Sequence, residues 1–329
     1  MKKTKLSLIL SGVIIVTAII VASCKKSTTT TPTTTPDTST TSATDNNTGQ
    51  QSSQDITNFG SQGIDNGSLS TYRLAQGASV FAGVSGTATV IPAGNKKIEV
   101  TFINFVGLDG HTRNGTIEYD WSSSLSTTTY TANFYKDSGL VINVTTPLNN
   151  YTVDNNTVTI NTKTIKNIGR VYTSGQPQLT WTDVSNITIT KPSSGGTIQW
   201  NGNWNIALLN TGSYTYTNLD GTSTTHNYPA VFFGYGISNN FIDWTQALVS
   251  VNGTFGGTAS DGETYTGNIS SPLVLNFNCT PMWTKFLYVA GTINFTPTGK
   301  TTRSINYGSG VCDLTYVVSI GSFSVTITI

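Results

Sequence analysis

The segment LTYVVSIGSFSVTITI (residues 314–329) decides the fold class. Apolar and polar residues alternate on both sides of Gly321-Ser322, and this period of two is typical of a half-buried β-strand. Two residues that include glycine suffice for a tight hairpin turn. The segment therefore predicts a β-hairpin with one apolar face. That face consists of Leu314, Tyr316, Val318, Ile320, Phe323, Val325, Ile327 and Ile329.

The same alternation recurs along the chain from about residue 69, for example at residues 97–103, 186–190 and 273–277. No helical period is evident after residue 22. Asx-Gly pairs tolerate the positive φ angles of tight turns and lie near many of these segments. They are Asp109-Gly110, Asn114-Gly115, Asn201-Gly202, Asp220-Gly221, Asn252-Gly253 and Asp261-Gly262. We therefore predict an all-β fold built from antiparallel β-sandwich-like or extended meander units.

A pentapeptide of the form Gly-Thr-Ile-x-aromatic occurs at residues 115–119, 196–200 and 291–295. Its isoleucine and aromatic residue share one strand face, so both are predicted to lie in the core. The Gly/Ser/Pro segment at residues 191–196 predicts a boundary between an N-terminal β unit (69–191) and a C-terminal β unit (192–329).

The N-terminus predicts export. Three lysines in the first five residues precede an apolar run, and Val21-Ala-Ser-Cys24 follows it. This is the pattern of a lipoprotein signal peptide (1–23), with Cys24 as the lipidated residue. The apolar run has about 17 residues, fewer than the roughly 20 that span a bilayer, so we expect membrane attachment through the lipid and its palmitate chain.

Residues 24–68 begin with this cysteine and continue as a stretch rich in Thr, Ser and Pro. Few of their side chains are apolar, so burial cannot offset the entropy lost on ordering. The sequence predicts a disordered tether.

Composition limits the function. The chain has 329 residues with 17 Lys+Arg and 16 Asp+Glu, a formal net charge of +1. A nucleic-acid partner is not expected, because phosphate binding needs clustered cations. Two histidines and two cysteines beyond Cys24 offer too few soft ligands for a zinc cluster, and we expect no metal or other cofactor.

Cys279 and Cys312 form an even pair for an oxidising compartment. Alternation places both on apolar strand faces. The two interpretations are a disulfide between them and two buried free thiols.

Residues 241–329 include the motif aromatic-Gly-x-Gly-x-Cys-Asp at Tyr307-Gly-Ser-Gly-Val-Cys-Asp313. This part of the chain resembles the C-terminal part of a group of Bacteroidota lipoproteins, which usually have Asp in place of Asn306 and Asn in place of Leu314. The resemblance implies a secreted all-β lipoprotein and carries no activity with it. Acidic residues often follow the lipidated cysteine in surface-displayed members, whereas two lysines follow Cys24 here. An outer-membrane lipoprotein facing either the periplasm or the cell surface is expected.

Three tryptophans are the candidate ligand-binding residues: Trp200, Trp204 and Trp244. Each lies near Asn or Asp, and an exposed ring bordered by amides can grip a sugar ring. The alternative is that Trp200 and Trp204 belong to the core. They share a strand face only if Asn201-Gly202 does not form a turn.

No catalytic residue is predicted. Glu118 and Asp120 project from one strand face and resemble a glycosidase carboxylate pair, but such pairs are common on solvent faces. Asp261 and Glu263 form an equally weak pair. His111 and His226 have no evident nucleophile or base beside them.

The sequence thus predicts a lipid-anchored all-β cell-envelope protein with a non-catalytic binding or structural role. Three alternatives remain open: a glycan-binding accessory lipoprotein of an outer-membrane uptake system, an adhesin or fimbria-like subunit, and a β-sandwich carbohydrate hydrolase. The expected partners are the membrane, through the N-terminal lipid, and a glycan or envelope protein.

Overall fold

A computed structural model describes the part of the chain from residue 37 to residue 328, with gaps. The described residues are 37–66, 83–94, 96–107, 109–124, 139–173, 176–192, 195–209, 211–217, 223–229, 232–233, 241–242, 248–276 and 288–328. The chain divides into two compact units, residues 1–36 and 37–329, and all described residues belong to the second.

One 14-stranded sheet dominates the second unit. Its strands are β1 (Gly83–Gly94), β2 (Lys97–Gly107), β3 (Thr112–Asp120), β4 (Val141–Thr145), β5 (Thr152–Val153), β6 (Asn156–Thr173), β7 (Gln176–Thr190), β8 (Thr197–Leu208), β13 (Leu248–Thr258), β14 (Thr264–Asn276), β15 (Ala290–Pro297), β16 (Arg303–Ser309), β17 (Thr315–Ile320) and β18 (Phe323–Thr328). Two separate strand pairs are β9 (Thr211–Thr217) with β10 (Ser223–Pro229) and β11 (Phe232–Phe233) with β12 (Phe241–Ile242).

The strand order is β1-β2-β3-β4-β6-β7-β8-β13-β14-β15-β16-β17-β18, with β5 paired to β3 and β6. Nearly every strand pairs with its neighbour in the sequence, and the pairing is antiparallel throughout. The all-β prediction is therefore confirmed, in its meander form. Among the described residues, the partner of the large sheet is a helix, so a sandwich of two sheets is not what forms.

The predicted boundary at residues 191–196 is wrong. Strands β7 and β8 pair without a register shift from Thr180↔Ala207 to Thr190↔Thr197. The segment between them is a hairpin loop, closed by a hydrogen bond from Lys191 N to Gly196 O at 3.1 Å. Gly196 has a φ of 80° in this turn, and one continuous sheet spans the two predicted units.

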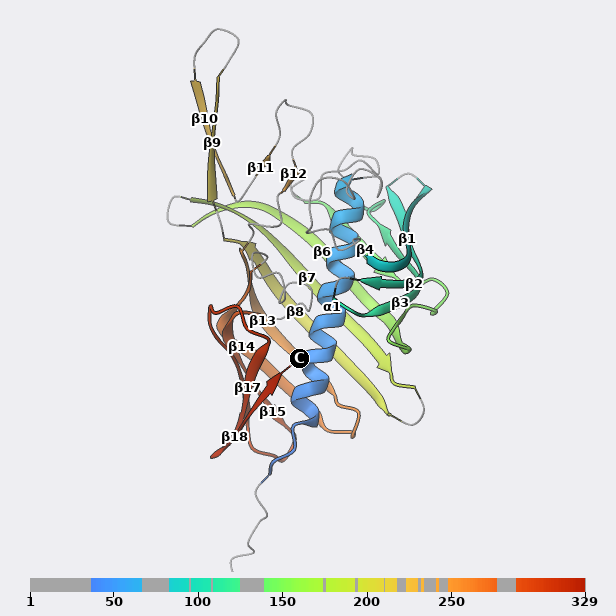
Figure 1. The fold of residues 1–329 in the computed structure, drawn as a ribbon, viewed down its shortest axis with the longest axis vertical. Helices are drawn as coiled ribbons and strands as arrows, with labels where there is room; N and C mark the ends of the chain where they lie inside the picture. Colours follow the sequence, from blue (N-terminus) through green and yellow to red (C-terminus); the bar gives the residue numbers. More distant parts are fainter. Residues whose placement is uncertain are drawn as a thin grey trace, which may run out of the picture. The chain divides into compact units, whose positions relative to one another are not determined.

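The prediction of a disordered tether is wrong for α1 (Thr41–Asn66), a helix of 26 residues. Figure 1 shows α1 lying along one face of the sheet. The residues before position 37 and those at 67–68 lie outside the described part of the chain. Few residues of α1 are apolar, but Ala43, Ile56, Phe59 and Ile64 are all fully buried. The helix forms because the sheet supplies partners that the isolated segment lacks, since packing contributes most of the stability of helices in proteins.

Two glycines let α1 approach the aromatic residues of the sheet closely. A Cβ atom on Gly49 would lie 2.4 Å from Cγ of Trp200, and one on Gly60 would lie 2.2 Å from Cε1 of Tyr119. Neither aromatic ring has room for even a methyl group at these points. Glycine is unfavourable in an isolated helix, but here the two glycines leave room for the aromatic rings of the sheet to contact the helix backbone.

The recurrent pentapeptide is confirmed as a core element. All its isoleucines and aromatic residues, together with Trp121, are buried: Ile117, Tyr119, Ile198, Trp200, Ile293 and Phe295. The glycine of each copy has a positive φ, and a side chain there would come within about 2.5 Å of a backbone carbonyl oxygen of a neighbouring segment. These glycines are Gly115, Gly196 and Gly291.

The turn predictions are partly right. Asp109-Gly110 and Asp261-Gly262 lie in turns, and Gly321 has a φ of 58° between β17 and β18, which confirms the last hairpin. The prediction of a turn is wrong for three other Asx-Gly pairs, which lie inside strands. They are Asn114-Gly115, Asn201-Gly202 and Asn252-Gly253. Asp220-Gly221 lies outside the described residues. Pairing on both sides of a strand outweighs a local preference for a turn.

Replacing Gly49 with Ala tests the close helix–sheet approach. Helix propensity alone predicts a stabilisation of about 1 kcal/mol. The clash with Trp200 predicts the opposite, a destabilisation of about 1–3 kcal/mol, because an overpacked core must shift. Urea unfolding measures the difference. Thr48→Ala, on the less buried side of α1, is the matched control and should not destabilise. A Gly49→Ala variant at least as stable as the wild type would contradict the described packing.

Candidate functional site

Two buried carboxylates of α1, Asp45 and Asp55, are bound by residues outside the helix. Lys191 Nζ donates to Asp45 Oδ1 at 2.8 Å, and the backbone N and Oγ of Ser260 donate to Asp45 Oδ2 at 2.7 and 2.6 Å. Asp45 is only 2% exposed. Ser260 belongs to the glycine-rich segment at residues 256–261, so that segment holds the helix at this point.

A second buried carboxylate, Asp55, lies near the middle of α1. Arg113 Nε of β3 donates to Asp55 Oδ2 at 2.8 Å, and the same guanidinium also binds Asp109. Tyr151 Oη donates to Asp55 Oδ2 at 3.3 Å. Burial raises the pKa of Asp55, while the charge of Arg113 opposes this shift. Burial also lowers the pKa of Arg113, but Asp55 and Asp109 outweigh it and the net pKa is raised.

A third cluster, centred on Lys163 and Asp183, lies entirely within the helix–sheet interface. Lys163 Nζ donates to both carboxylate oxygens of Asp183 at 2.7 Å, to Ser185 Oγ at 2.7 Å and to Ser53 Oγ at 2.9 Å. Thr57 Oγ1 of α1 donates to Asp183 Oδ2 at 2.5 Å. Both charged side chains are 0% exposed, and burial lowers the pKa of Lys163. No face of this cluster is open to a ligand, so its role is to fix α1 on β6 and β7.

Trp200 and Trp204 are core residues, each 1% exposed, so their prediction as exposed ligand platforms is wrong. β8 runs straight through Asn201-Gly202, which puts both tryptophans on the face that meets α1. Their ring centroids lie 5.1 Å apart, and Trp200 Nε1 donates to Asn46 Oδ1 at 3.1 Å. Trp244 lies outside the described residues.

The two carboxylates on β3, Glu118 and Asp120, form ion pairs with the same lysine. Lys97 Nζ lies 3.1 Å from Glu118 Oε1 and 3.2 Å from Asp120 Oδ2. The hydrogen bond from Lys97 to Glu118 is the main cause of the raised pKa of Lys97. This arrangement is typical of a surface ion pair.

The other weak candidates occupy turns. Asp261 Oδ1 accepts a hydrogen bond from Glu263 N at 3.1 Å, which closes the turn between β13 and β14. His111 Nδ1 lies 2.5 Å from Asp154 Oδ2 at the surface. The side chain of His226 is outside the described part. Among the described residues, no three His, Cys, Asp or Glu side chains are grouped as metal ligands.

Cys312 is disulfide-bonded, and its partner lies outside the described residues. Cys279 and Cys24 are both in that undescribed part, so the Cys279–Cys312 pairing stays a prediction. Cys312 itself is exposed, in the segment between β16 and β17, and the prediction that it faces inward is wrong. Strand alternation fails there because the ladder ends at residue 309.

The face of the sheet that points away from α1 carries two rows of small residues that are polar except for Gly256 and Val184. Cross-strand register aligns the members of the first row: Thr162, Asn186, Asn201, Gly256, Thr266 and Thr296. The second row runs beside it: Thr164, Val184, Asn203, Thr254, Asn268, Asn294, Ser304, Ser319 and Ser324. Adjacent members are about 4.8 Å apart, the spacing of neighbouring strands. Between β6 and β15 neither row contains a charged residue, whereas beyond Thr164 the second row continues through Asn143 to Asp120 and Lys97 on β3 and β2.

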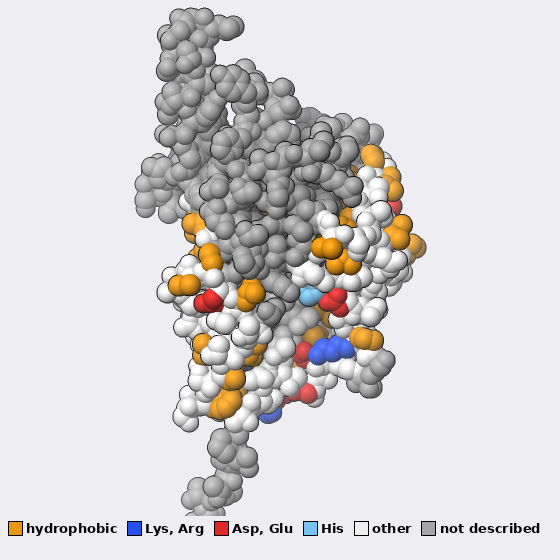
Figure 2. Space-filling model, viewed as in Figure 1, with side chains coloured by type: hydrophobic (Ala, Val, Ile, Leu, Met, Phe, Trp, Pro, Cys, Tyr) orange, Lys and Arg blue, Asp and Glu red, His pale blue; other side chains and the backbone are white. Residues whose placement is uncertain are grey.

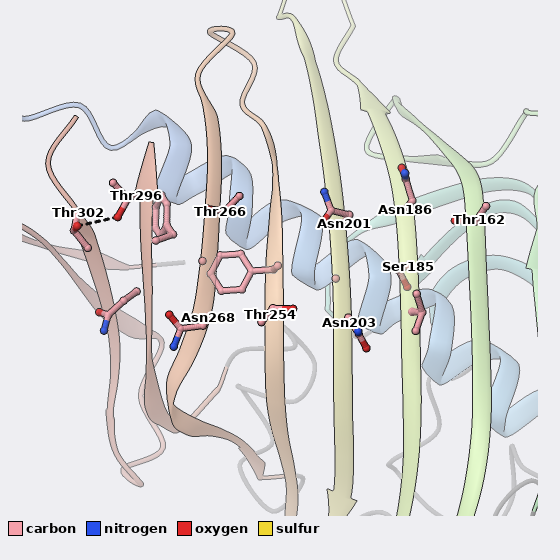
Figure 3. A pocket seen from close by; sticks show the side chains of 16 residues that line it. Thr162, Ser185, Asn186, Asn201, Asn203, Thr254, Thr266, Asn268, Thr296 and Thr302 are labelled. Atoms are coloured by element: carbon pink, nitrogen blue, oxygen red, sulfur yellow. Dashed lines mark hydrogen bonds between the residues drawn. The ribbon is translucent and has the colours of Figure 1, made fainter. Parts of the chain in front are cut away.

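A hollow of about 780 Å³ lies over the middle of these rows, from β6 to β15. Figure 3 shows its Asn and Thr side chains on neighbouring strands, with Thr296 and Thr302 joined by a hydrogen bond of 2.8 Å. Sixteen residues line the hollow, and none is ionisable. Amides and hydroxyls supply both hydrogen-bond donors and hydrogen-bond acceptors. The hollow can therefore hold an uncharged ligand rich in hydroxyl groups.

These rows were not singled out from the sequence, although a signal for them exists. Asn and Thr recur at outward positions of β7, β8, β13 and β14, but strand order and register are needed to bring them together. The face that carries α1 is likewise mostly uncharged where it is described, as Figure 2 shows.

Comparisons with protein-family models, with curated proteins and with solved structures found no match. No helix in the described part of the chain is both long enough and apolar enough to cross a bilayer.

A double-mutant cycle tests the role of the Lys163–Asp183 cluster. Lys163→Met or Asp183→Leu alone leaves one charge buried without its partner and should cost about 3–5 kcal/mol of unfolding free energy. The double variant removes both charges and should be more stable than either single variant. Chemical denaturation measures all three. Additive losses in the double variant would show that the two side chains do not form a buried pair.

Proposed function

We propose that this protein is a lipid-anchored component of the cell envelope that binds a neutral, hydroxyl-rich polymer, without catalysis, through the hollow on the outer face of its sheet. A neutral polysaccharide is an uncharged polymer rich in hydroxyl groups, so it is the ligand that we propose. The observation that carries the proposal is the pair of uncharged Asn/Thr rows across β6–β15. Attachment through Cys24 and an outer-membrane location belong to the same proposal and rest on residues 1–24.

The chemistry of the hollow favours an uncharged ligand. A charged group placed there would lose water without meeting an opposite charge, which is costly. Sugar hydroxyls both donate and accept hydrogen bonds, as the side chains of Asn203, Thr254 and Asn268 do. The rows repeat across many strands, and this suits a polymer with repeated hydroxyl groups better than a single small molecule.

The same geometry disfavours hydrolysis at this site. A glycosidase needs two carboxyl groups beside the scissile bond, and the hollow is lined by none. Glu118 and Asp120 lie on β3, outside the hollow, and share Lys97. An accessory role in glycan uptake and an adhesive role both remain consistent with polymer binding. They differ in whether the bound polymer is later taken up.

Binding of full-length protein to immobilised dextran, galactomannan and xyloglucan tests the proposal, with acidic polygalacturonate as the reference. We expect binding to at least one neutral polymer. Asn203→Ala/Asn268→Ala should weaken that binding roughly tenfold or more, because each hydrogen bond contributes about 0.5–1.5 kcal/mol. Biolayer interferometry measures the affinity.

Asn205→Ala is the matched control. Asn205 is exposed on the same face of β8, two residues from Asn203, but does not line the hollow. This variant should bind as the wild type does. The proposal would be contradicted if the protein bound polygalacturonate but no neutral polymer, or if it bound no polymer at all. It would also be contradicted if the double variant bound a neutral polymer as tightly as the wild type.

A further inference from the structure

Strand β18 is an outer edge of the large sheet. It pairs with β17, its one partner among the described residues, from Thr315↔Thr328 to Ile320↔Phe323. The residues that flank a two-residue turn exchange both backbone hydrogen bonds, and the pattern then alternates along the hairpin. Phe323, Val325 and Ile327 therefore bond to β17. The backbone N–H and C=O groups of Ser324 and Thr326 point away from it, toward the free edge.

The β18 edge lacks the features by which proteins block edge pairing. Such features are charged residues, prolines, bulges and very short strands. The sequence of β18 is FSVTIT, which has no charge and no proline, and its ladder with β17 has no register shift. The opposite edge differs, because β1 contains Pro92 and its ladder with β2 has three register shifts. One edge is thus blocked, and within the described part of the chain no further strand pairs with the other.

The inner side of β18 is apolar and incompletely covered. Tyr316, Val318 and Ile320 on β17 are buried, but the side chains of Phe323 and Val325 on β18 are only half-buried, although they pack against the core. A further strand with apolar residues at matching positions would complete their burial. The partner strand must therefore carry apolar side chains on its inner side.

We propose that β18 pairs antiparallel with β18 of a second copy of this chain. The strand is complementary to itself when Val325 of one copy lies opposite Val325 of the other. In that register Phe323 lies opposite Ile327 of the second copy, so apolar residues meet on the inner side. Ser324 exchanges both backbone hydrogen bonds with Thr326 of the second copy, and small polar residues meet on the outer side.

This pairing has a consequence for the outer face. A two-fold axis through the edge turns the outer faces of both copies to the same side. The second polar row, which ends at Ser319 and Ser324, then meets Thr326 of the second copy, two residues from the end of that copy's own row. The dimer would present one surface of twice the length, and two linked sites bind a polymer more tightly than one.

Cysteine cross-linking in cells that make the full chain tests this register. In the proposed pair the two Val325 residues form a non-hydrogen-bonded pair with Cα atoms about 4.5 Å apart, which suits a disulfide. Val325→Cys should therefore run mostly as a covalent dimer of the 35.0 kDa chain on non-reducing gels. Thr326→Cys should stay mostly monomeric, because residue 326 lies opposite residue 324 and points to the other face. The unsubstituted chain sets the background.

A second substitution separates edge pairing from chance collision. Thr326→Pro removes an outward N–H that β17 does not use, so it blocks the edge and leaves the hairpin ladder intact. Added to Val325→Cys, it should abolish the cross-link, whereas Thr326→Val should preserve it. No dimer from Val325→Cys, equal dimer from Thr326→Cys, or a cross-link that survives Thr326→Pro would overturn the proposal. Polysaccharide binding is measured separately, so either proposal can fail alone.

Discussion

Each buried charge between α1 and the sheet requires a partner from the other side or from a neighbouring strand, and this requirement fixes how the two elements fit. Asp45 meets Lys191, and Asp55 meets Arg113. Lys163 and Asp183 bind each other and the hydroxyls of Ser53 and Thr57. A buried charge without a partner costs several kcal/mol, so a shift of α1 along the sheet would break several pairs at once. The polar helix thus has one register on the sheet.

The docked helix also decides which surface is left for binding. α1 covers the inner face, where the aromatic residues Trp200, Trp204 and Tyr119 pack. Two of the three tryptophans that the sequence offers for a ligand, Trp200 and Trp204, therefore pack against the helix instead. What remains on the outer face from β6 to β15 is a regular, uncharged array of amides and hydroxyls whose positions are set by strand register. The proposed polymer binding depends on this array, whereas the proposed edge pairing depends on β18.

Local patterns predict much of the fold. Alternation identifies β2, β7, β14 and β18, and the Gly-Thr-Ile-x-aromatic repeat identifies core residues. The same patterns fail where distant segments decide. Residues 41–66 read as disordered because their partners are distant in the sequence, as Arg113 is 58 positions from Asp55. The Asn201-Gly202 pair reads as a turn because strands on both sides of β8 are not visible locally. The candidate site was missed for that reason as well, because its rows exist only across strands.

Hydrogen exchange of the backbone amides of α1, followed by mass spectrometry on the full-length protein, tests the central claim most directly. Buried, helical amides exchange only when the structure opens, so the account predicts that residues 41–66 are protected about as strongly as β7 and β8. Exchange of residues 41–66 within seconds, while β7 and β8 remain protected, would contradict it and would restore the interpretation of this segment as a disordered tether.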